Sequence, residues 1–327
     1  MENRLMGRLG RHASVVGLGT WQLGADWGEV EEKDALAVLD AAAEEGVTFF
    51  DTADVYGDGR SESLIGSWTK SNPGADVFVA TKMGRRMDQV PENYAAANFR
   101  AWTDRSRTNL GVDTLDLVQL HCPPTAVIES DAVFDALDAL VESSAIAAYG
   151  VSVETCEQAL KAIARPGTAS IQIIFNAFRL KPLDEVLPAA QAAGVGIIAR
   201  VPLASGLLSG RYRLDTAFAA NDHRAYNRHG EAFDQGETFS GVDYETGVEA
   251  AAEFSRLAAP GVTPAQTALR WIIQQPGVTT VIPGARSAQQ ARDNARSSSV
   301  AALSGETLAA VTDLYDRRIR PEVHSRW

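Results

Sequence analysis

The sequence predicts a single (β/α)8 barrel domain that takes in residues 1–327. Short β-branched runs alternate with longer Ala-, Leu- and Glu-rich stretches of helical period, which is the pattern of repeated βα units. Eight such runs occur in the chain, and 45% of its residues are hydrophobic, enough for one large core. No Pro/Gly/Ser-rich linker divides the chain, so we expect no second domain.

The eight expected strands follow one another, with helices between most of them. The strands are predicted at residues 14–20, 47–54, 77–82, 115–121, 147–153, 171–176, 195–202 and 279–284. The helices are predicted at residues 31–45, 95–110, 132–143, 156–164, 183–193, 248–257 and 265–274. The connection at about 211–245 is polar, aromatic-rich and too long for a plain loop, which leaves two interpretations open, a lid and a mobile surface excursion.

A doubly wound sheet is the rival architecture, because it also alternates strands with helices. Its dinucleotide fingerprint, G-x-G-x-x-G, follows the first strand. In this chain Gly17 and Gly19 of GLGTWQLG lack the third glycine of that fingerprint. The barrel is therefore the preferred prediction.

Charge and cysteine content argue against several classes of protein. The chain has 30 basic and 42 acidic residues and a formal net charge of -12, which disfavours nucleic acid or an anionic membrane as partner. Cys122 and Cys156 have no metal-ligand spacing and are too few for a disulfide framework. The N-terminal residues lack the apolar core of a signal peptide, and no stretch reaches the ~18 apolar residues of a membrane helix. We expect a soluble, cytoplasmic protein.

Four polar side chains stand at the ends of three successive expected strands. Asp51 and Tyr56 lie in DTADVYG, Lys82 lies in ATKMG, and His121 lies in LVQLHCP. Because the carboxyl ends of barrel strands all open onto one face, we expect these four side chains to be neighbours.

These residue types suit the delivery of a proton to a carbonyl oxygen. A tyrosine, with an ordinary pKa of about 10, is a useful acid when that pKa is lowered, and the charge of Lys82 would lower the pKa of Tyr56. Asp51 would anchor the lysine, and a neutral His121 would orient the carbonyl. Each residue alone has a structural explanation, as a helix cap, a packed aromatic, a surface lysine or a core histidine. Their combination at strand ends favours a shared catalytic role.

With these motifs the chain resembles the aldo-keto reductase superfamily, from GLGTWQLG to IPGARSAQQARDN. It is most similar in pattern to the bacterial general-stress and inositol-cluster members. The family's catalytic Asp, Tyr, Lys and His fall on Asp51, Tyr56, Lys82 and His121. The resemblance implies a barrel fold, and it implies NADPH bound across the barrel mouth without a Rossmann domain.

The resemblance also implies where the cofactor is held. Ser152 and Gln172 would hold the nicotinamide carboxamide, residues 199–211 would wrap the pyrophosphate, and residues 282–294 would bind the adenosine half. Arg286 is the main reason to expect NADP(H) rather than NAD(H). The full set of expected cofactor contacts is Thr20, Trp21, Asp51, Ser152, Gln172, Arg200, Val201, Pro202, Leu203, Ser205, Gly206, Arg211, Gly284, Arg286, Ser287, Gln290, Asp293 and Asn294.

Three positions depart from the family pattern. Arg200 stands where many members place an aromatic residue under the nicotinamide, and its planar guanidinium could stack there instead. Val153 follows Ser152 where members often have Asn, which removes one amide contact. The Lys-Ser-Val motif of mammalian-type members is replaced by residues 284–286.

The expected substrate pocket lies beside the catalytic residues. Its wall is predicted to consist of Trp21, Trp27, Tyr56 and His121, from the loops after the first strands. Pocket loops vary independently of strand ends, so the sequence leaves the physiological substrate, the preferred reaction direction and the oligomeric state open.

The predicted function is the reversible, NADPH-dependent reduction of aldehydes or ketones to alcohols, with Tyr56 as proton donor and a small-molecule carbonyl as partner. The alternative is a catalytically weak, cofactor-binding regulatory subunit resembling potassium-channel β subunits, which the complete set of four catalytic residues disfavours. A metal-dependent barrel hydrolase needs a His/carboxylate cluster, and no second histidine is placed to join His121, so no metal site is predicted.

Overall fold

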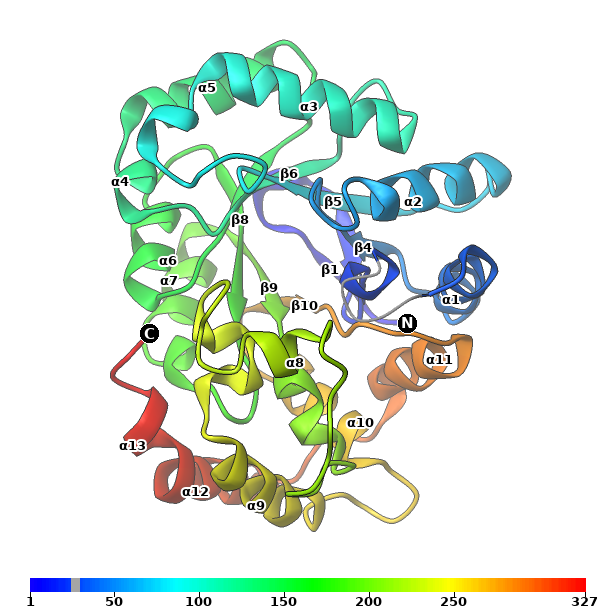
Figure 1. Cartoon of the computed structure of the whole chain (residues 1–327), viewed down its shortest axis with the longest axis vertical. Helices are drawn as coiled ribbons and strands as arrows, with labels where there is room; N and C mark the ends of the chain where they lie inside the picture. The colour runs from blue at the N-terminus through cyan, green and yellow to red at the C-terminus, as the bar shows by residue number, and fades with distance from the viewer. Residues whose placement is uncertain (25–29) are drawn as a thin grey trace.

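The computed structural model describes residues 1–24 and 30–327. Its centre is a parallel sheet of eight strands in the order β10-β9-β8-β7-β6-β5-β4-β3. Main-chain bonds close this sheet into a barrel (Figure 1), because the Gly17 amide donates to the Val281 carbonyl at 2.8 Å and the Val281 amide donates to the Val15 carbonyl at 3.0 Å. The prediction of a (β/α)8 barrel is confirmed. The strands are β3 (Leu18–Gly19), β4 (Phe49–Asp51), β5 (Phe78–Met83), β6 (Leu117–His121), β7 (Tyr149–Ser152), β8 (Thr168–Ile174), β9 (Gly196–Arg200) and β10 (Val278–Val281).

Helices surround the strands as a ring (Figure 1). All seven helices predicted from the sequence are present, with ends that differ by up to four residues. The ring also contains helices that the sequence analysis missed, among them α2 and α11. The α-helices are α1 (Glu32–Glu44), α2 (Arg60–Ser71), α3 (Ala96–Leu110), α4 (Thr125–Ile128), α5 (Asp131–Glu142), α6 (Cys156–Ile163), α7 (Val186–Ala193), α8 (His223–Tyr226), α9 (Tyr244–Ser255), α10 (Pro264–Ile273), α11 (Ala288–Arg296), α12 (Gly305–Leu314) and α13 (Arg320–Val323).

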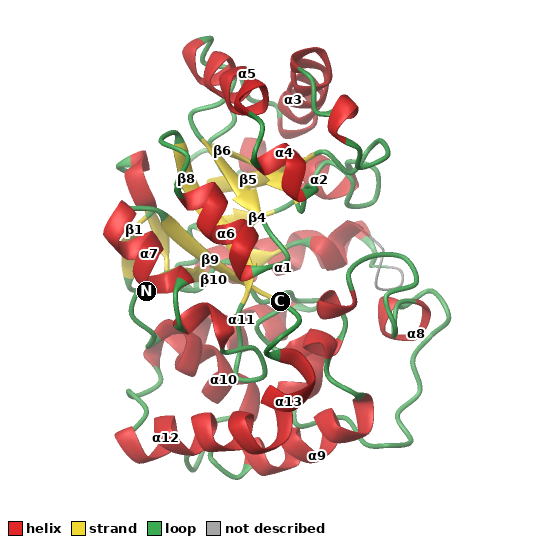
Figure 2. Cartoon of the chain, turned by 90° about the vertical axis from the view of Figure 1, so that its left-hand side faces the viewer, coloured by secondary structure: helices red, strands yellow, loops and turns green. Residues whose placement is uncertain are grey.

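A hairpin of β1 (Asn3–Leu5) and β2 (His12–Ser14) covers the N-terminal end of the barrel, opposite to α8 (Figure 2). The strand predicted at 14–20 is therefore divided. Ser14 ends the hairpin, Leu18–Gly19 forms the barrel strand, and the main chain of residues 15–17 between them bonds to Val281. Met6 follows β1 and packs, fully buried, in a cluster with Phe49 and Phe78 inside the barrel. These apolar side chains fill the lower barrel and leave the carboxyl ends of the strands for a site.

The long connection (residues 211–243) joins a 3-10 segment, η5 (Ala204–Ser209), to α9. It contains α8 and two 3-10 turns, η6 (Gln235–Glu237) and η7 (Phe239–Gly241). Asn227 holds its fold locally, since the Asn227 side-chain oxygen accepts the amides of Ala232 and Phe233 at 2.8 and 2.9 Å. The long connection lies over the carboxyl end of the barrel, where the His223 and Trp21 ring centroids are 5.1 Å apart.

Among the residues that the structure describes, no helix combines the length and apolar character needed to span a bilayer.

Candidate active site

Three neighbouring strand ends bring the four predicted catalytic residues together. Asp51 is the last residue of β4, Lys82 lies near the end of β5, His121 is the last residue of β6, and Tyr56 stands in the turn after β4. The Lys82 ammonium donates to Asp51 Oδ2 at 2.7 Å, to the Thr52 carbonyl at 2.8 Å and to the Tyr56 hydroxyl at 3.2 Å. Parallel pairing of β4, β5 and β6 thus brings together residues that are spread over the chain. We name these four residues, Asp51, Tyr56, Lys82 and His121, the catalytic cluster after their predicted role.

The turn after β4 holds Tyr56 in place because glycine follows it. Gly57 has φ +58, and a Cβ there would lie 2.2 Å from the Gly24 carbonyl oxygen. A side chain would therefore push the Tyr56 turn away from the η2 segment (Trp21–Gly24). Glycine is required here for both the left-handed conformation and the close approach.

Burial and charge set the proton state of the cluster. Burial raises the pKa of Tyr56 above 10, although the nearby Lys82 ammonium pulls it down. The expectation that Lys82 brings the pKa of Tyr56 toward neutrality is thus wrong, because desolvation of the phenolate outweighs the attraction of Lys82. Burial also lowers the pKa of Lys82, but Asp51 and Tyr56 more than offset this, and the net pKa is raised. Lys82 is therefore charged and Tyr56 carries its proton.

His121 is a neutral imidazole at physiological pH. Its pKa is held well below 6.5, first by burial and then by the positive charges of Arg85, Lys82 and Arg200. The His121 ring stands perpendicular to the Tyr56 ring, with the centroids 6.0 Å apart. Its Nδ1 atom is buried and has no hydrogen-bond partner among the described residues. This agrees with the sequence expectation of a neutral histidine beside the tyrosine.

The second carboxylate oxygen of Asp51 is also satisfied. Gln172 Nε2 donates to Asp51 Oδ1 at 2.7 Å, and the amide of Gln119 lies 3.4 Å from the same atom. Ser152 Oγ lies 3.4 Å from Gln172 Oε1. The two residues expected to hold a carboxamide therefore form a polar chain with Asp51 in the barrel, whereas Gln119 was not predicted.

A cavity of about 570 Å³ opens above this chain at the carboxyl ends of the strands. Of the predicted substrate-pocket residues, Trp21, Tyr56 and His121 line it, and Trp27 lies outside the described residues. Most of the predicted cofactor residues line it as well: Trp21, Asp51, Ser152, Gln172, Arg200, Val201, Pro202, Leu203, Ser205, Gly206, Arg211, Gly284, Arg286, Gln290, Asp293 and Asn294.

Two predicted cofactor residues do not line the cavity. Thr20 is fully buried, and its hydroxyl donates to the Asp51 carbonyl at 2.8 Å. Ser287 caps α11, where its hydroxyl accepts the Gln290 amide at 3.3 Å. Thr20 thus ties β3 to β4, and Ser287 fixes the start of the helix that borders the cavity.

One wall of the cavity is a backbone segment in unusual conformations. Val201, Ala204 and Ser205 have φ values of +52, +47 and +53, and Gly206 has φ +98. Left-handed conformations are costly for residues with a Cβ and cluster at ligand sites. We call residues 201–206 the strained loop.

Arg200 is held by neighbours that the sequence analysis did not predict. Its guanidinium donates to Glu154 at 2.7 Å and to the Val153 carbonyl at 3.1 Å. Glu237 of the long connection lies 3.8 Å from Arg200, and it accepts from Arg85 at 2.9 Å. Arg85 and Glu154 come soon after expected strands, and that position could have placed them at the barrel mouth. The sequence around Glu237 carries no such signal.

The two acids of this group differ in pKa. Burial would raise the pKa of Glu237, but Arg85 and Arg200 outweigh it and lower the pKa to about 2. Burial raises the pKa of Glu154, and the charge of Glu237 adds to the rise, although Arg200 opposes it. Glu237 is therefore the carboxylate that is held ionised between the two arginines.

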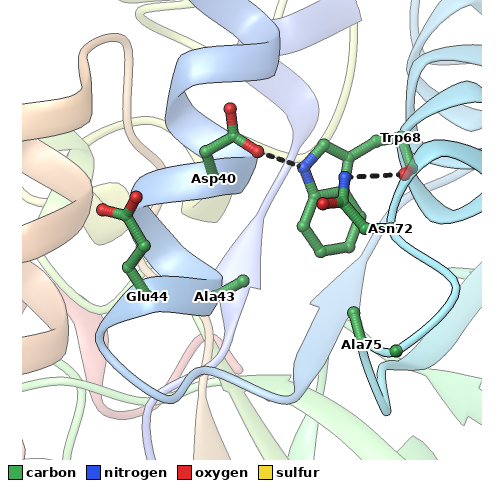
Figure 3. A pocket seen from close by; sticks show the side chains of 7 residues that line it. Asp40, Ala43, Glu44, Trp68, Asn72 and Ala75 are labelled. Atoms are coloured by element: carbon green, nitrogen blue, oxygen red, sulfur yellow. Dashed lines mark hydrogen bonds between the residues drawn. The ribbon is translucent and has the colours of Figure 1, made fainter.

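A second cavity, of about 290 Å³, lies between the C-terminal ends of α1 and α2 (Figure 3). Because the helices run antiparallel to the strands, it opens at the end of the barrel away from the catalytic cluster. Trp68 Nε1 donates to Asp40 at 2.7 Å, and the Asn72 amide donates to the Trp68 carbonyl at 3.0 Å (Figure 3). These groups satisfy one another, so the cavity belongs to helix packing rather than to the active site.

Comparison with known proteins agrees with this geometry. A model of the Aldo/keto reductase family matches residues 15–316. Aldo-keto reductase YhdN of Bacillus subtilis is 31% identical over 295 residues, which cover 88% of this chain and 85% of that protein. An uncharacterized oxidoreductase of Mycobacterium tuberculosis, Rv2298, is 32% identical over 317 residues, covering 94% and 91%.

Solved structures have the same fold over nearly the whole chain. The glycerol dehydrogenase AKR11B4 from Gluconobacter oxydans superposes with a TM-score of 0.80 at 29% identity, covering 97% of this chain and 96% of that one. An aldo-keto reductase from Klebsiella pneumoniae, solved in complex with NADPH, has a TM-score of 0.71 at 25% identity, covering 96% of both chains.

Proposed function

The chain belongs to the aldo/keto reductase family, and on that premise we propose that it reduces aldehydes or ketones with NADPH, taking the proton from Tyr56. The observation that carries the proposal is the Lys82 ammonium, which contacts Asp51 at 2.7 Å and Tyr56 at 3.2 Å beside an open cavity. A buried lysine held between a carboxylate and a tyrosine hydroxyl is suited to stabilising a phenolate.

The cavity residues fit NADP(H). The cavity reaches from the catalytic cluster to Asn294 in α11, so one elongated ligand can lie along it. Arg286 and Arg211 line the far part and provide cations for phosphate groups. The start of α11 adds a helix N-terminus, which favours anions. The relative from Klebsiella pneumoniae carries NADPH in its structure, which supports the same ligand here.

The chain's own groups divide the proton chemistry between them. NADPH, when bound, supplies a hydride to the carbonyl carbon. Neutral His121 donates a hydrogen bond to the carbonyl oxygen and orients it. Tyr56 gives its hydroxyl proton to that oxygen as the C–O double bond becomes a single bond, and Lys82 stabilises the phenolate that is left. In alcohol oxidation the same phenolate accepts the proton.

Aromatic side chains shelter this proton transfer from water. The Trp21 and Tyr56 rings stack with centroids 6.0 Å apart, and Phe233 of the long connection meets the Trp21 ring edge-on at 5.9 Å. An apolar wall of this kind strengthens the charge interactions inside the cavity. It also favours carbonyl substrates with an apolar group beside the reacting carbon.

The test compares wild-type protein with the Tyr56→Phe variant. NADPH oxidation would be followed with a panel of aldehydes and ketones, and NADP⁺ reduction would be followed with glycerol. We expect wild type to turn over with NADPH, and Tyr56→Phe to lose about 10²- to 10⁴-fold in rate while still binding NADPH. Wild-type turnover in Tyr56→Phe would exclude Tyr56 as the acid.

A matched control is available in Tyr149→Phe. The Tyr149 hydroxyl donates to Asp138 at 2.7 Å on the helix side of the barrel, so its loss should leave turnover unchanged. If wild type binds NADPH but reduces no carbonyl, the reductase proposal fails and the regulatory-subunit alternative replaces it.

A further inference from the structure

Four charged side chains from four separate segments meet beside the strained loop. We call them the mouth cluster: Arg85 after β5, Glu154 after β7, Arg200 at the end of β9 and Glu237 in the long connection. Their side chains are 20%, 14%, 9% and 8% exposed. Buried charges destabilise the folded protein unless each is paired. Here every member of the mouth cluster lies within 4.0 Å of an opposite charge.

The cluster also joins the long connection to the strained loop through the main chain. Ser205 Oγ donates to the Glu237 carbonyl at 3.1 Å and accepts the Phe239 amide at 3.0 Å. Ser205 itself has φ +53 and is buried. One hydroxyl therefore fastens a strained residue of the cavity wall to both sides of Thr238.

Strain makes these contacts necessary. Val201, Ala204 and Ser205 each hold a left-handed conformation that is unfavourable for a residue with a Cβ. Such conformations persist only where the surroundings enforce them. The strained loop follows β9 directly and is fastened by the long connection on its other side, so this geometry depends on where Glu237 sits.

Two other interpretations explain less. Cys122, Glu154 and Glu237 offer ligand atoms within 4.8 Å of one another, as in a metal site, but both carboxylates already accept from arginines. A cluster that only stabilised the fold would have no reason to include Arg200 and Glu237, which line the cavity.

We propose that Glu237 is a positioning residue for the cofactor: it fixes Arg200 and the strained loop in the geometry that binds NADP(H). This inference rests on the proposed function, because it assumes that NADP(H) enters this cavity. By reciprocity, a bound cofactor also holds the long connection against the barrel. Cofactor binding and the ordering of the long connection are therefore coupled, so that each favours the other.

The test uses Glu237→Gln, which keeps the shape and removes the charge. We expect the Kd for NADPH, measured by fluorescence titration without substrate, to rise about tenfold, within the range typical of coupled sites. Trypsin should cut the long connection faster, at sites such as Arg213 and Arg228, and NADPH should protect it less. Glu231→Gln is the control, since Glu231 is an exposed acid of the same connection.

A second variant guards against misfolding. Ser205→Ala removes the hydroxyl link and leaves all four charges, so it should raise the NADPH Kd and the cleavage rate in the same direction. Wild-type NADPH affinity and protease resistance in Glu237→Gln would overturn the proposal. Faster cleavage everywhere in the chain would also overturn it, because that result means general destabilisation.

The outcomes separate this inference from the proposed function. If wild type does not bind NADPH, the proposed function fails, and the inference about the cofactor fails with it. If wild type binds NADPH and Glu237→Gln binds it with the same Kd, only the positioning role fails.

Discussion

Two buried ionic groups contribute side chains to the lining of the cavity, and they are built differently. The catalytic cluster joins Asp51 to Lys82, whose side chains are 4% and 1% exposed, across the adjacent strands β4 and β5. The mouth cluster joins Arg85 to Glu237, 152 positions apart, and Glu237 belongs to no strand. Strand pairing fixes the contact between Asp51 and Lys82, whereas contacts between the barrel and the long connection fix the contact between Arg85 and Glu237.

The difference follows from backbone freedom. Residues in the barrel are hydrogen-bonded to strands on both sides, so a side chain at a strand end has little choice of position. Residues in a connection keep local hydrogen bonds and move as a unit. Mutation of the catalytic cluster should therefore affect the core, whereas mutation of Glu237 should act first on the long connection.

The largest expected effect comes from breaking the catalytic cluster with Lys82→Met. Asp51 would remain buried without its counter-charge, so the free energy of unfolding should fall by about 3 to 5 kcal/mol. Carbonyl reduction should be lost as well. Urea unfolding measures the stability, and Glu157→Gln, which breaks an exposed pair with Lys161, should leave the midpoint unchanged. An unchanged midpoint in Lys82→Met would mean that the cluster does not support the core.

A smaller loss of stability is expected from removing Trp327, which contacts Asp234 of the long connection. Trp327 donates to Asp234 at 2.9 Å, and its ring lies 3.9 Å from the Arg179 guanidinium carbon. Trp327→Ala should lower the free energy of unfolding by about 3 kcal/mol and weaken NADPH binding.

Trp68→Ala is its matched control. Trp68 is equally buried and also donates to an aspartate, but it lies in the helix ring. It should lower stability by a similar amount and leave NADPH affinity unchanged. Equal losses of affinity in both variants would show that the long connection has no special relation to the cofactor.

The far end of the cavity gives the next effect. Arg286→Ala should weaken NADPH by about 10- to 100-fold and NADH much less, because a charge-assisted contact to a phosphate contributes about 1.5 to 3 kcal/mol. Isothermal titration with each cofactor measures the difference. Arg292→Ala serves as the control, since Arg292 lies in α11, which begins two residues after Arg286, and pairs with Glu44 at 2.9 Å. Equal losses for NADPH and NADH would contradict a phosphate contact by Arg286.

The smallest effect is a predicted absence of change near neutral pH. Tyr56 donates only while protonated, and its raised pKa keeps it protonated until the pH rises above 10. His121 has a pKa well below 6.5, so it stays neutral until the pH falls well below that value. The profile of kcat/KM against pH should therefore be level between these limits. An alkaline loss with an apparent pKa near 7 would restore the expectation that Lys82 brings Tyr56 toward neutrality.

Local pattern was enough to predict the barrel and the catalytic cluster. A strand end fixes both where a residue lies and which way it faces, so Asp51, Lys82 and His121 could be grouped from their motifs. The same reasoning missed α2, whose buried apolar residues are only Leu64, Ile65 and Trp68. Ser61 and Glu62 share that buried face and bond to Thr20 and Thr81, so the apolar stripe covers only about one turn of the helix.

The residues expected to contact the cofactor could be predicted only where they lie in the family motifs. The resemblance placed Arg200 and the strained loop at the cavity, and they do line it. It gave no sign that Glu154 and Glu237 hold Arg200, since neither acid lies in those motifs. An ion pair between distant segments leaves no periodic pattern in the sequence. In the sequence, a single buried acid of a polar connection cannot be told from an exposed one.

Sequence thus determined the fold and the grouping of Asp51, Lys82 and His121, because hydrophobic period and strand-end motifs act over a few residues. The pKa order of Tyr56 and His121, the conformation of the strained loop and the partners of Glu237 came only from the folded chain. These three features depend on burial and on charges that distant segments bring together. Burial and such charge contacts arise only when the barrel has closed.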